Sequence, residues 1–276
     1  MRTVGLLHPG RMGAAVGAEI RRNGHDVLWC TEGRSEATRM RAEQAGLTPV
    51  DELRELLERC DVVLSICPPA AAEELARRVA GLGFGGVFAD ANAVNPATLH
   101  RIVAHLDPMP VVDGSIIGPP PSGHRTGTRL HLSGPAAHRD VVAELVSGTR
   151  VEPVLLGTEH GQASALKMAF ASYQKAARVL AAVAHSLADA HGVSEALLAE
   201  ADRMPGRILA QRDYLPSVAA RAWRWGLEMR EIAQTLSDAG LPPELAEAAA
   251  TVLARWDVHR GDYDVSTDTV LKDLRR

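Results

Sequence analysis

Lysine is rare in this chain, which makes the position of each lysine informative. Of the 30 basic residues only Lys167, Lys175 and Lys272 are lysines, and the others are arginines. Arginine cannot release its proton in a protein whereas lysine can, so a retained lysine is a candidate for proton transfer. Position alone leaves Lys167 evenly balanced between this role and that of a solvated helix cation. For Lys175 and Lys272 the solvated cation is the better interpretation.

A glycine-rich turn follows the first buried run, residues 4–7. The turn reads His-Pro-Gly-Arg-Met-Gly over 8–13 and precedes an amphipathic segment. A strand, a glycine-rich turn and a helix are the context of the dinucleotide fingerprint G-x-G-x-x-G, because glycines let backbone amides approach a pyrophosphate. His8 replaces the first fingerprint glycine, so an ordinary tight turn is the alternative. The residues predicted to bind the cofactor here are Gly10, Arg11 and Met12.

A second predicted strand, 26–30, ends in Thr31-Glu32-Gly33-Arg34-Ser35, at the distance expected for the loop that holds an adenosine ribose. Glu32 could accept a hydrogen bond from a ribose 2′-hydroxyl. Arg34 with Ser35 could instead bind a 2′-phosphate through charge-assisted hydrogen bonds. We favour the phosphate and therefore NADPH, with Thr31 beside it and NAD still possible. The alternative is that Ser35 only caps the following helix.

Further candidates follow three later strands, predicted at 61–66, 86–89 and 111–115. Ligands bind at the carboxyl ends of strands in open α/β sheets. We therefore expect the first two of these ends to contact the cofactor through Cys67, Pro68 and Asn92. The third leads into a stiff loop rich in glycine and proline, which could present backbone amides to a substrate anion or merely connect two strands.

The elements that position these residues divide the chain into two parts. Short β-like runs alternate with helical patterns up to a last strand near 153–156, which predicts a Rossmann-type doubly wound α/β sheet over 1–157. An Ala-rich segment then reads as one long interdomain helix, 158–193, whose apolar stripe includes Leu166, Phe170, Tyr173 and Leu180. No comparable β-like run follows, so 158–276 is predicted to be a small all-α domain.

Composition limits the classes of function. A chain of 276 residues with 46% hydrophobic and 23% charged residues is typical of a soluble globular protein. The net charge is −4 and arginines are interspersed with acids, so nucleic-acid binding is not expected. The three cysteines lack metal-ligand spacing, and no uninterrupted apolar stretch approaches ~18 residues. We expect no metal, no membrane association and a cytoplasmic location.

Several of these motifs together resemble the β-hydroxyacid dehydrogenase superfamily, which includes 6-phosphogluconate dehydrogenase, 3-hydroxyisobutyrate dehydrogenase and the imine reductases. The matching pieces cover residues 1 to about 175 in order: 10–13, 67–69, 113–118 and 161–168. The segments 221–229 and 240–244 resemble a small domain of unknown function found on poorly characterised 6-phosphogluconate-dehydrogenase-like proteins.

The resemblance implies hydride transfer between NADP and a small hydroxyacid or keto-type substrate, with Lys167 as general acid/base. The family's Ser-Gly-Gly substrate loop is Ile117-Gly118-Pro119 here, and the asparagine four residues beyond the lysine is Ala171. These changes imply a more apolar pocket and make a phosphorylated sugar acid an unfavourable substrate. The residues expected to contact substrate are Ser115, Ile117, Gly118, Phe170 and Gln174, the last as a replacement for the missing amide.

Two other functions stay open. An imine-reductase-like enzyme is one alternative, although imine reductases usually replace this lysine. A non-catalytic dinucleotide-binding protein is the other, suggested by the changes at His8, Ile117 and Ala171. We also expect a homodimer built on the helical half, because residues 194–276 are few for a large independent core and short helices with apolar residues need cover.

Overall fold

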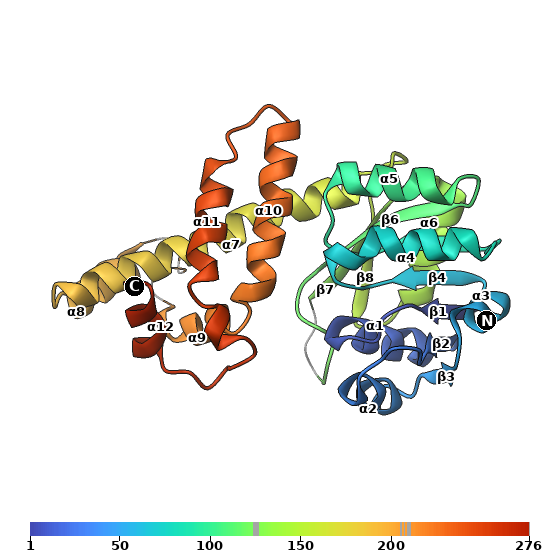
Figure 1. The fold of residues 1–276 in the computed structure, drawn as a ribbon, viewed down its shortest axis with the longest axis horizontal. Coiled ribbons are helices and arrows are strands. Elements are labelled where there is room, and N and C mark those ends of the chain that lie inside the picture. The colour runs from blue at the N-terminus through green and yellow to red at the C-terminus, as the bar shows by residue number, and fades with distance from the viewer. Residues whose placement is uncertain (124–126, 205, 207, 209–210, 276) are drawn as a thin grey trace. The chain divides into compact units, whose positions relative to one another are not determined.

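The computed structural model describes residues 1–123, 127–204, 206, 208 and 211–275. These residues form two compact units, Met1–Lys167 and Met168–Arg276 (Figure 1). The division between the units falls inside one long helix, α7, which runs from Gln162 to Ala190. That helix lies within the range predicted from the sequence.

The first unit is built on one eight-stranded sheet in the order β3-β2-β1-β4-β5-β6-β7-β8. Strands β1 to β6 are parallel, β7 is antiparallel to β6, and β8 is parallel to β7. Strands β2 and β3 lie on one side of β1, and β4, β5 and β6 lie on the other side, which is the doubly wound arrangement. The strands are β1 Thr3–Leu6, β2 Asp26–Cys30, β3 Thr48–Val50, β4 Val62–Ser65, β5 Val87–Asp90, β6 Val111–Ile117, β7 Thr128–Ser133 and β8 Val151–Leu155.

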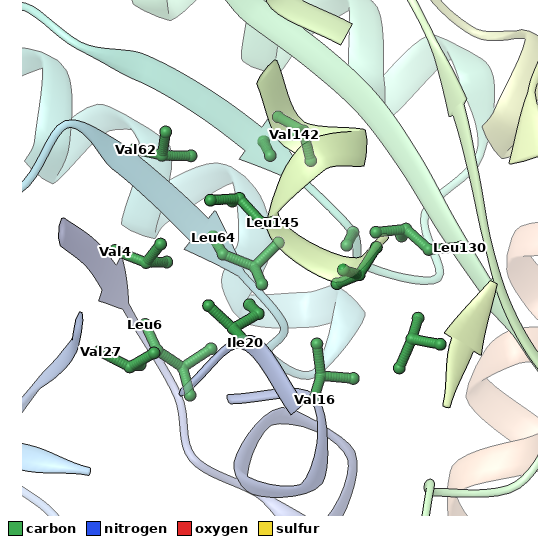
Figure 2. Close-up of a cluster of buried hydrophobic side chains, with 14 of the residues drawn as sticks. Val4, Leu6, Val16, Ile20, Val27, Val62, Leu64, Leu130, Val142 and Leu145 are labelled. Carbon is green, nitrogen blue, oxygen red and sulfur yellow. The ribbon is translucent and has the colours of Figure 1, made fainter. Parts of the chain in front are cut away.

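Helices cover both faces of this sheet, which explains why its central strands are almost continuously apolar. Successive side chains of a strand point to opposite faces, so Val62 and Leu64 of β4 pack with α1 and α6 (Figure 2), whereas Val63 packs with α3, α4 and α5. The helices are α1 Arg11–Arg22, α2 Glu36–Gln44, α3 Leu53–Arg59, α4 Pro69–Gly81, α5 Pro96–Leu106 and α6 Ala136–Val146. Asn95 caps α5 by accepting the N–H of Thr98 at 2.7 Å, as its sequence position predicts.

Two glycines permit close backbone approaches beside the predicted site. A Cβ atom at Gly13 would lie 2.3 Å from the carbonyl oxygen of His8, so α1 can start this close to the turn only with glycine there. Gly118, just after β6, has φ +124 and would place a Cβ 2.2 Å from the carbonyl oxygen of Gly127. The backbone just after β6 therefore lies close to the start of β7, and the stiffness of the connecting loop stays a prediction.

The second unit is helical and has its own core. It contains most of α7, followed by α8 Ser194–Arg203, η1 Arg212–Tyr214, α9 Leu215–Ala219, α10 Ala222–Asp238, α11 Glu244–Ala254, η2 Asp257–His259 and α12 Thr267–Asp273. Its core joins mostly small residues of α7 and α11 to large ones of α10, including Trp225, and to Trp256, which follows α11. The α/β sheet followed by a small all-α domain confirms the predicted fold class.

The buried face of α7 differs from the predicted stripe. Phe170, Tyr173 and Leu180 are exposed, whereas Ala171 and Ala182 lie in the core. Small side chains let the neighbouring helices approach closely, so the Ala-rich face is the one that packs inside the unit. The apolar stripe expected from the sequence is therefore not the face of α7 that packs inside this unit.

Lys175 is also placed differently from its predicted position. It is only 4% exposed, and its Nζ lies 2.6 Å from Glu228 Oε2 of α10. The Nζ is also 5.7 Å from the centroid of the Trp225 ring. The interpretation as a solvated cation was wrong, because a carboxylate 53 residues later in the chain compensates the buried charge.

Candidate active site

The start of α7 is held by the carboxylate of Asp113, a buried residue of β6. Asp113 Oδ2 accepts the backbone N–H groups of Gly161, Ala163 and Ser164 at 2.9, 3.0 and 3.1 Å. The Ser133 hydroxyl donates to Oδ2 at 2.9 Å, and the Ser164 hydroxyl donates to Oδ1 at 2.7 Å. The first amides of a helix have no partner within the helix, so this carboxylate satisfies them and neutralises the positive helix end.

Lys167 lies three residues beyond Ser164, and its side chain also contacts β6. Its Nζ donates to the backbone carbonyl oxygen of Ile116 at 2.7 Å. Thus β6 holds the helix at two points, through the Asp113 side chain and through the carbonyl of Ile116. The structure places the predicted acid/base beside the predicted substrate strand.

Two buried polar side chains lie side by side in the sheet next to this lysine. Ser115 of β6 is in register with His131 of β7, and among the described residues neither Ser115 Oγ nor His131 Nδ1 has a hydrogen-bond partner. Burial lowers the pKa of His131, and the charges of Arg129 and Lys167 lower it further. His131 is therefore a neutral imidazole near a cation at neutral pH. Sequence reasoning missed it, although a histidine between two core leucines in a strand was a visible signal.

The other predicted substrate residues are divided between the two units. Ile117 is buried at the end of β6, and Gly118 follows it in the left-handed conformation described above. Phe170 and Gln174 belong to the second unit, where Phe170 is exposed and Gln174 is half-buried. Their contact with a substrate stays a prediction.

Asn92 joins two of the predicted cofactor-binding loops. Its Oδ1 accepts the backbone N–H of Cys67 at 2.6 Å, and its Nδ2 donates to Ser65 Oγ at 2.9 Å and to Asp90 Oδ2 at 2.8 Å. Burial raises the pKa of Asp90 to about 7, against the opposing effect of the hydrogen bonds from Asn92. Burial likewise raises the pKa of the Cys67 thiol to about 12, so it stays protonated. Pro68, the N-cap residue of α4, follows directly.

The predicted ribose loop folds back onto the fingerprint turn. Arg34 Nη1 lies 2.9 Å from His8 Nδ1, and Arg34 Nη2 donates to the Leu7 carbonyl oxygen at 2.7 Å. Glu32 instead pairs with Arg78 of α4 at 3.2 Å. Thr31 accepts the backbone N–H of Arg34 at 3.2 Å, which closes the loop.

Ser35 has the backbone position of an N-cap but not the usual side-chain bond. It precedes α2 in an extended conformation, and its side chain makes no capping hydrogen bond. The hydroxyl lies 3.2 Å from Thr38 Oγ1. The simple capping explanation of Ser35 is therefore incomplete, and its hydroxyl stays a candidate ligand for phosphate.

The N-terminus of α1 fits a pyrophosphate. Gly10 is the N-cap residue, Arg11 is the first helical residue, and the first turn contains no acidic side chain. Met12 packs partly against the core and fixes the helix on the sheet. The first amides of a helix have no acceptor within the helix, and together with the close approach at Gly13 and an adjacent arginine they suit a diphosphate.

Two kinds of feature are absent from the described residues. None of the helices in the described ranges is long and apolar enough to cross a membrane. No group of three or more His, Cys, Asp or Glu side chains in the same ranges is arranged to hold a metal ion.

Comparison with known proteins gives relatives of both units. An uncharacterized 28.5 kDa protein from Methanothermus fervidus is 29% identical over 182 residues, which cover 66% of this chain and 69% of the relative. The structure of conserved protein MTH1747, of unknown function and described as similar to 3-hydroxyacid dehydrogenases, matches at 25% identity and a TM-score of 0.68, covering 93% of this chain and 98% of that one.

The fold also matches 3-hydroxyisobutyrate dehydrogenase from Mycobacterium tuberculosis, at 18% identity, a TM-score of 0.75 and complete coverage of both chains. Residues 188–256 match a domain of unknown function, DUF1932. Residues 3–145, more than half of the chain, match the NAD binding domain of 6-phosphogluconate dehydrogenase. The protein therefore belongs to the family of NAD-binding proteins related to 6-phosphogluconate dehydrogenase, in the subgroup that carries this helical C-terminal domain.

Proposed function

We propose that the protein is an NADP-dependent oxidoreductase that transfers hydride to or from the carbon of a small hydroxyacid or keto-type substrate. The observation that carries the proposal is the position of Lys167, whose Nζ is held 2.7 Å from the Ile116 carbonyl at the end of β6. A titratable amine fixed at the carboxyl end of a strand in a dinucleotide-binding sheet is suited to general acid/base work.

Each residue has a defined task in this reaction. Bound nicotinamide supplies the hydride acceptor or donor. In the oxidative direction Lys167 takes the proton of the substrate hydroxyl, and in the reductive direction it returns a proton to the carbonyl oxygen. Neutral His131 adds no positive charge near this amine. Ser115 Oγ, which is buried and has no hydrogen-bond partner among the described residues, is a further polar group on the strand that carries Ile116.

The preference for NADP(H) rests on the charges around the ribose loop. Arg34 is held at the fingerprint turn, and the Glu32 carboxylate is turned to Arg78. A carboxylate that would bind a free ribose 2′-hydroxyl is thereby engaged elsewhere, whereas a guanidinium that suits a phosphate lies at the site.

The test is a turnover assay with NADP(H) and NAD(H) against hydroxyacids, ketoacids and cyclic imines. We expect turnover of a hydroxyacid that carries no charge beyond its carboxylate, or of its keto product, because Ile117 is expected to make the pocket apolar. Turnover confined to cyclic imines would favour imine reduction. Tight NADPH binding without turnover of any compound would favour a non-catalytic dinucleotide-binding protein.

We further propose that the helical unit forms a homodimer. On α7 the apolar residues Phe170, Tyr173, Leu180 and Val183 are 43%, 71%, 57% and 45% exposed. Their spacing places them along one side of the helix, and an exposed apolar stripe of this kind suits burial against a second copy. Light scattering at micromolar concentration should give a dimer, and Tyr173→Asp with Leu180→Asp should give a monomer. A 29.5 kDa wild-type monomer would contradict the proposal.

A further inference from the structure

His8 stands where the fingerprint has its first glycine, and its ring is bonded to the arginine of the next loop. Arg34 Nη1 lies 2.9 Å from His8 Nδ1. A guanidinium can only donate, so Nδ1 must be unprotonated and accept this hydrogen bond. The ring proton is then on Nε2, on the side of Gly10, where a Cβ would lie 3.2 Å from that nitrogen. The geometry therefore specifies one neutral tautomer.

The charged groups that act on His8 are all cationic. Burial lowers its pKa below the usual 6.5, and Arg34 of the β2–α2 loop and Arg41 of α2 lower it further. From the β4–α4 connection, the Cys67 thiol is within range of Arg34, but its pKa of about 12 keeps it uncharged. Glu32, the acidic residue of the same loop as Arg34, pairs with Arg78. The positive charge around His8 thus has no anionic partner among these groups.

The two arginines, Arg34 and Arg41, also have buried N–H groups that could donate hydrogen bonds to a ligand. Among the described residues, neither Arg34 Nε nor Arg41 Nε has a hydrogen-bond partner. The rest of Arg41 is fixed, because its Nη2 donates to Thr38 Oγ1 at 2.9 Å. Buried N–H groups without acceptors are unfavourable, and a phosphate monoester supplies three acceptor oxygens and up to two negative charges. A phosphate bound between these two guanidinium groups and the imidazole would accept their hydrogen bonds and compensate their positive charge.

We propose that His8 takes up a proton from solvent when the 2′-phosphate of NADP(H) binds to Arg34 and Arg41, which makes NADP(H) affinity, but not NAD(H) affinity, depend on His8 and on pH. The Arg34–His8 hydrogen bond is exchanged in this step. Arg34 donates to a phosphate oxygen instead, and the newly protonated Nδ1 becomes a second donor. The inference rests on the proposed use of NADP(H), and it adds His8 and Arg41 as determinants of cofactor choice.

The direction of the pH effect follows from linkage. The free protein keeps His8 neutral at a pKa below 6.5, and a bound phosphate would raise that pKa. Between the two values the complex holds one more proton than the free protein, so affinity falls up to about tenfold for each unit of rising pH. Titration of the phosphate itself, near pH ~6, acts in the opposite direction. The contribution of His8 is therefore the difference between the wild type and a variant that cannot be protonated.

The experiment uses the full chain, with 2′,5′-ADP as the phosphate-bearing probe and 5′-AMP as the probe without the 2′-phosphate. Calorimetric titrations between about pH 6 and 8, in buffers of different ionisation enthalpy, count the protons taken up on binding. His8→Gln can still accept from Arg34 but cannot be protonated. His25→Gln is the matched control, because His25 is another histidine of lowered pKa whose Nδ1 accepts a hydrogen bond, here from the N–H of Arg2.

On binding 2′,5′-ADP, the wild type and His25→Gln should take up more protons than His8→Gln does. On binding 5′-AMP, both variants should take up the same number of protons as the wild type. Arg41→Ala should weaken 2′,5′-ADP binding about tenfold or more and leave 5′-AMP unchanged. If wild type and His8→Gln take up equal numbers of protons while Arg34→Ala binds 2′,5′-ADP more weakly than the wild type, the proposed role of His8 is overturned and the NADP preference is not. Equal binding of 2′,5′-ADP and 5′-AMP by the wild type would overturn the NADP preference as well.

Discussion

The Nζ of Lys167 and the carbonyl oxygen of Ile116 lie 2.7 Å apart. A main-chain carbonyl can accept a hydrogen bond from an ammonium group and also from a neutral amine. This contact can therefore persist when the lysine gains or loses a proton. A lysine anchored in this way can exchange protons without losing its orientation.

Lys167→Arg should retain cofactor affinity but lose ~10²–10⁴ in turnover, because arginine keeps the charge and cannot release a proton. Turnover and NADPH affinity are measured on the same preparation. Lys272→Arg, at an exposed position of α12, is the matched control and should change neither. Near-normal turnover of Lys167→Arg would show that the lysine contributes only its positive charge and does not transfer the proton.

Arg34→Ala should raise the Michaelis constant for NADPH by an order of magnitude or more and hardly affect NADH. A charge-assisted contact to phosphate is worth roughly 1.5–3 kcal/mol, and the 2′-hydroxyl of NADH cannot use it. Steady-state kinetics with both cofactors measure the ratio. A wild type that prefers NADH would show that Glu32, after leaving Arg78, is the ribose ligand.

Asp113→Asn should loosen the start of α7, because a neutral amide cannot replace a carboxylate that accepts five hydrogen bonds. We expect a loss of unfolding free energy on the order of 3 kcal/mol. Ser164→Ala, which removes one donor, should cost about 1 kcal/mol. Hydrogen exchange at the amides of Gly161, Ala163 and Ser164 reports the same contact directly. Unchanged exchange in Asp113→Asn would disprove the role of the carboxylate.

The stability of the first unit should fall as the pH rises toward neutrality, because of Asp90. Its folded pKa is raised to about 7, so between the unfolded value of 3.8 and about 7 the folded state binds more protons than the unfolded state. Each pH unit in that window then costs up to about 1.4 kcal/mol. Urea unfolding at several pH values should show a flatter profile for Asp90→Asn than for wild type. Asp26→Asn, at an exposed position, is the control and should leave the profile unchanged.

Lys175→Met should destabilise the helical unit by roughly 3–5 kcal/mol, because it leaves the buried Glu228 carboxylate without its ammonium partner. Arg224, whose Nε is 3.5 Å from Glu228 Oε1, can offset part of this cost. The double variant Lys175→Met with Glu228→Leu should recover stability. Denaturant midpoints that match those of Lys272→Met would show that the pair is not needed.

Local sequence signals predicted the fold and part of the site, whereas contacts between distant residues could not be predicted. The strand, turn and helix around Gly10 and Gly13 follow from backbone requirements that lie within a few residues. The contacts of Asp113 with the start of α7 join residues 48 to 51 positions apart, and the Lys175 pair joins residues 53 apart. Neither spacing leaves a periodic pattern. His8 was noticed only as a missing glycine, since its bond to Arg34 depends on the pairing of β1 with β2.

The hydrogen bonds between Asp113 and the start of α7 also limit where the chain can be cut into independently folding fragments. A fragment that stopped at residue 157, after the last strand, would contain Asp113 but only Ser133 among the donors to its carboxylate. That buried charge would favour local opening of β6 and β7 and expose apolar sheet edges. We therefore expect the smallest nucleotide-binding fragment that folds independently to extend into α7, beyond Ser164. For recombinant expression, the useful end of the first unit is set by a hydrogen-bonded carboxylate and lies inside a helix, close to its start.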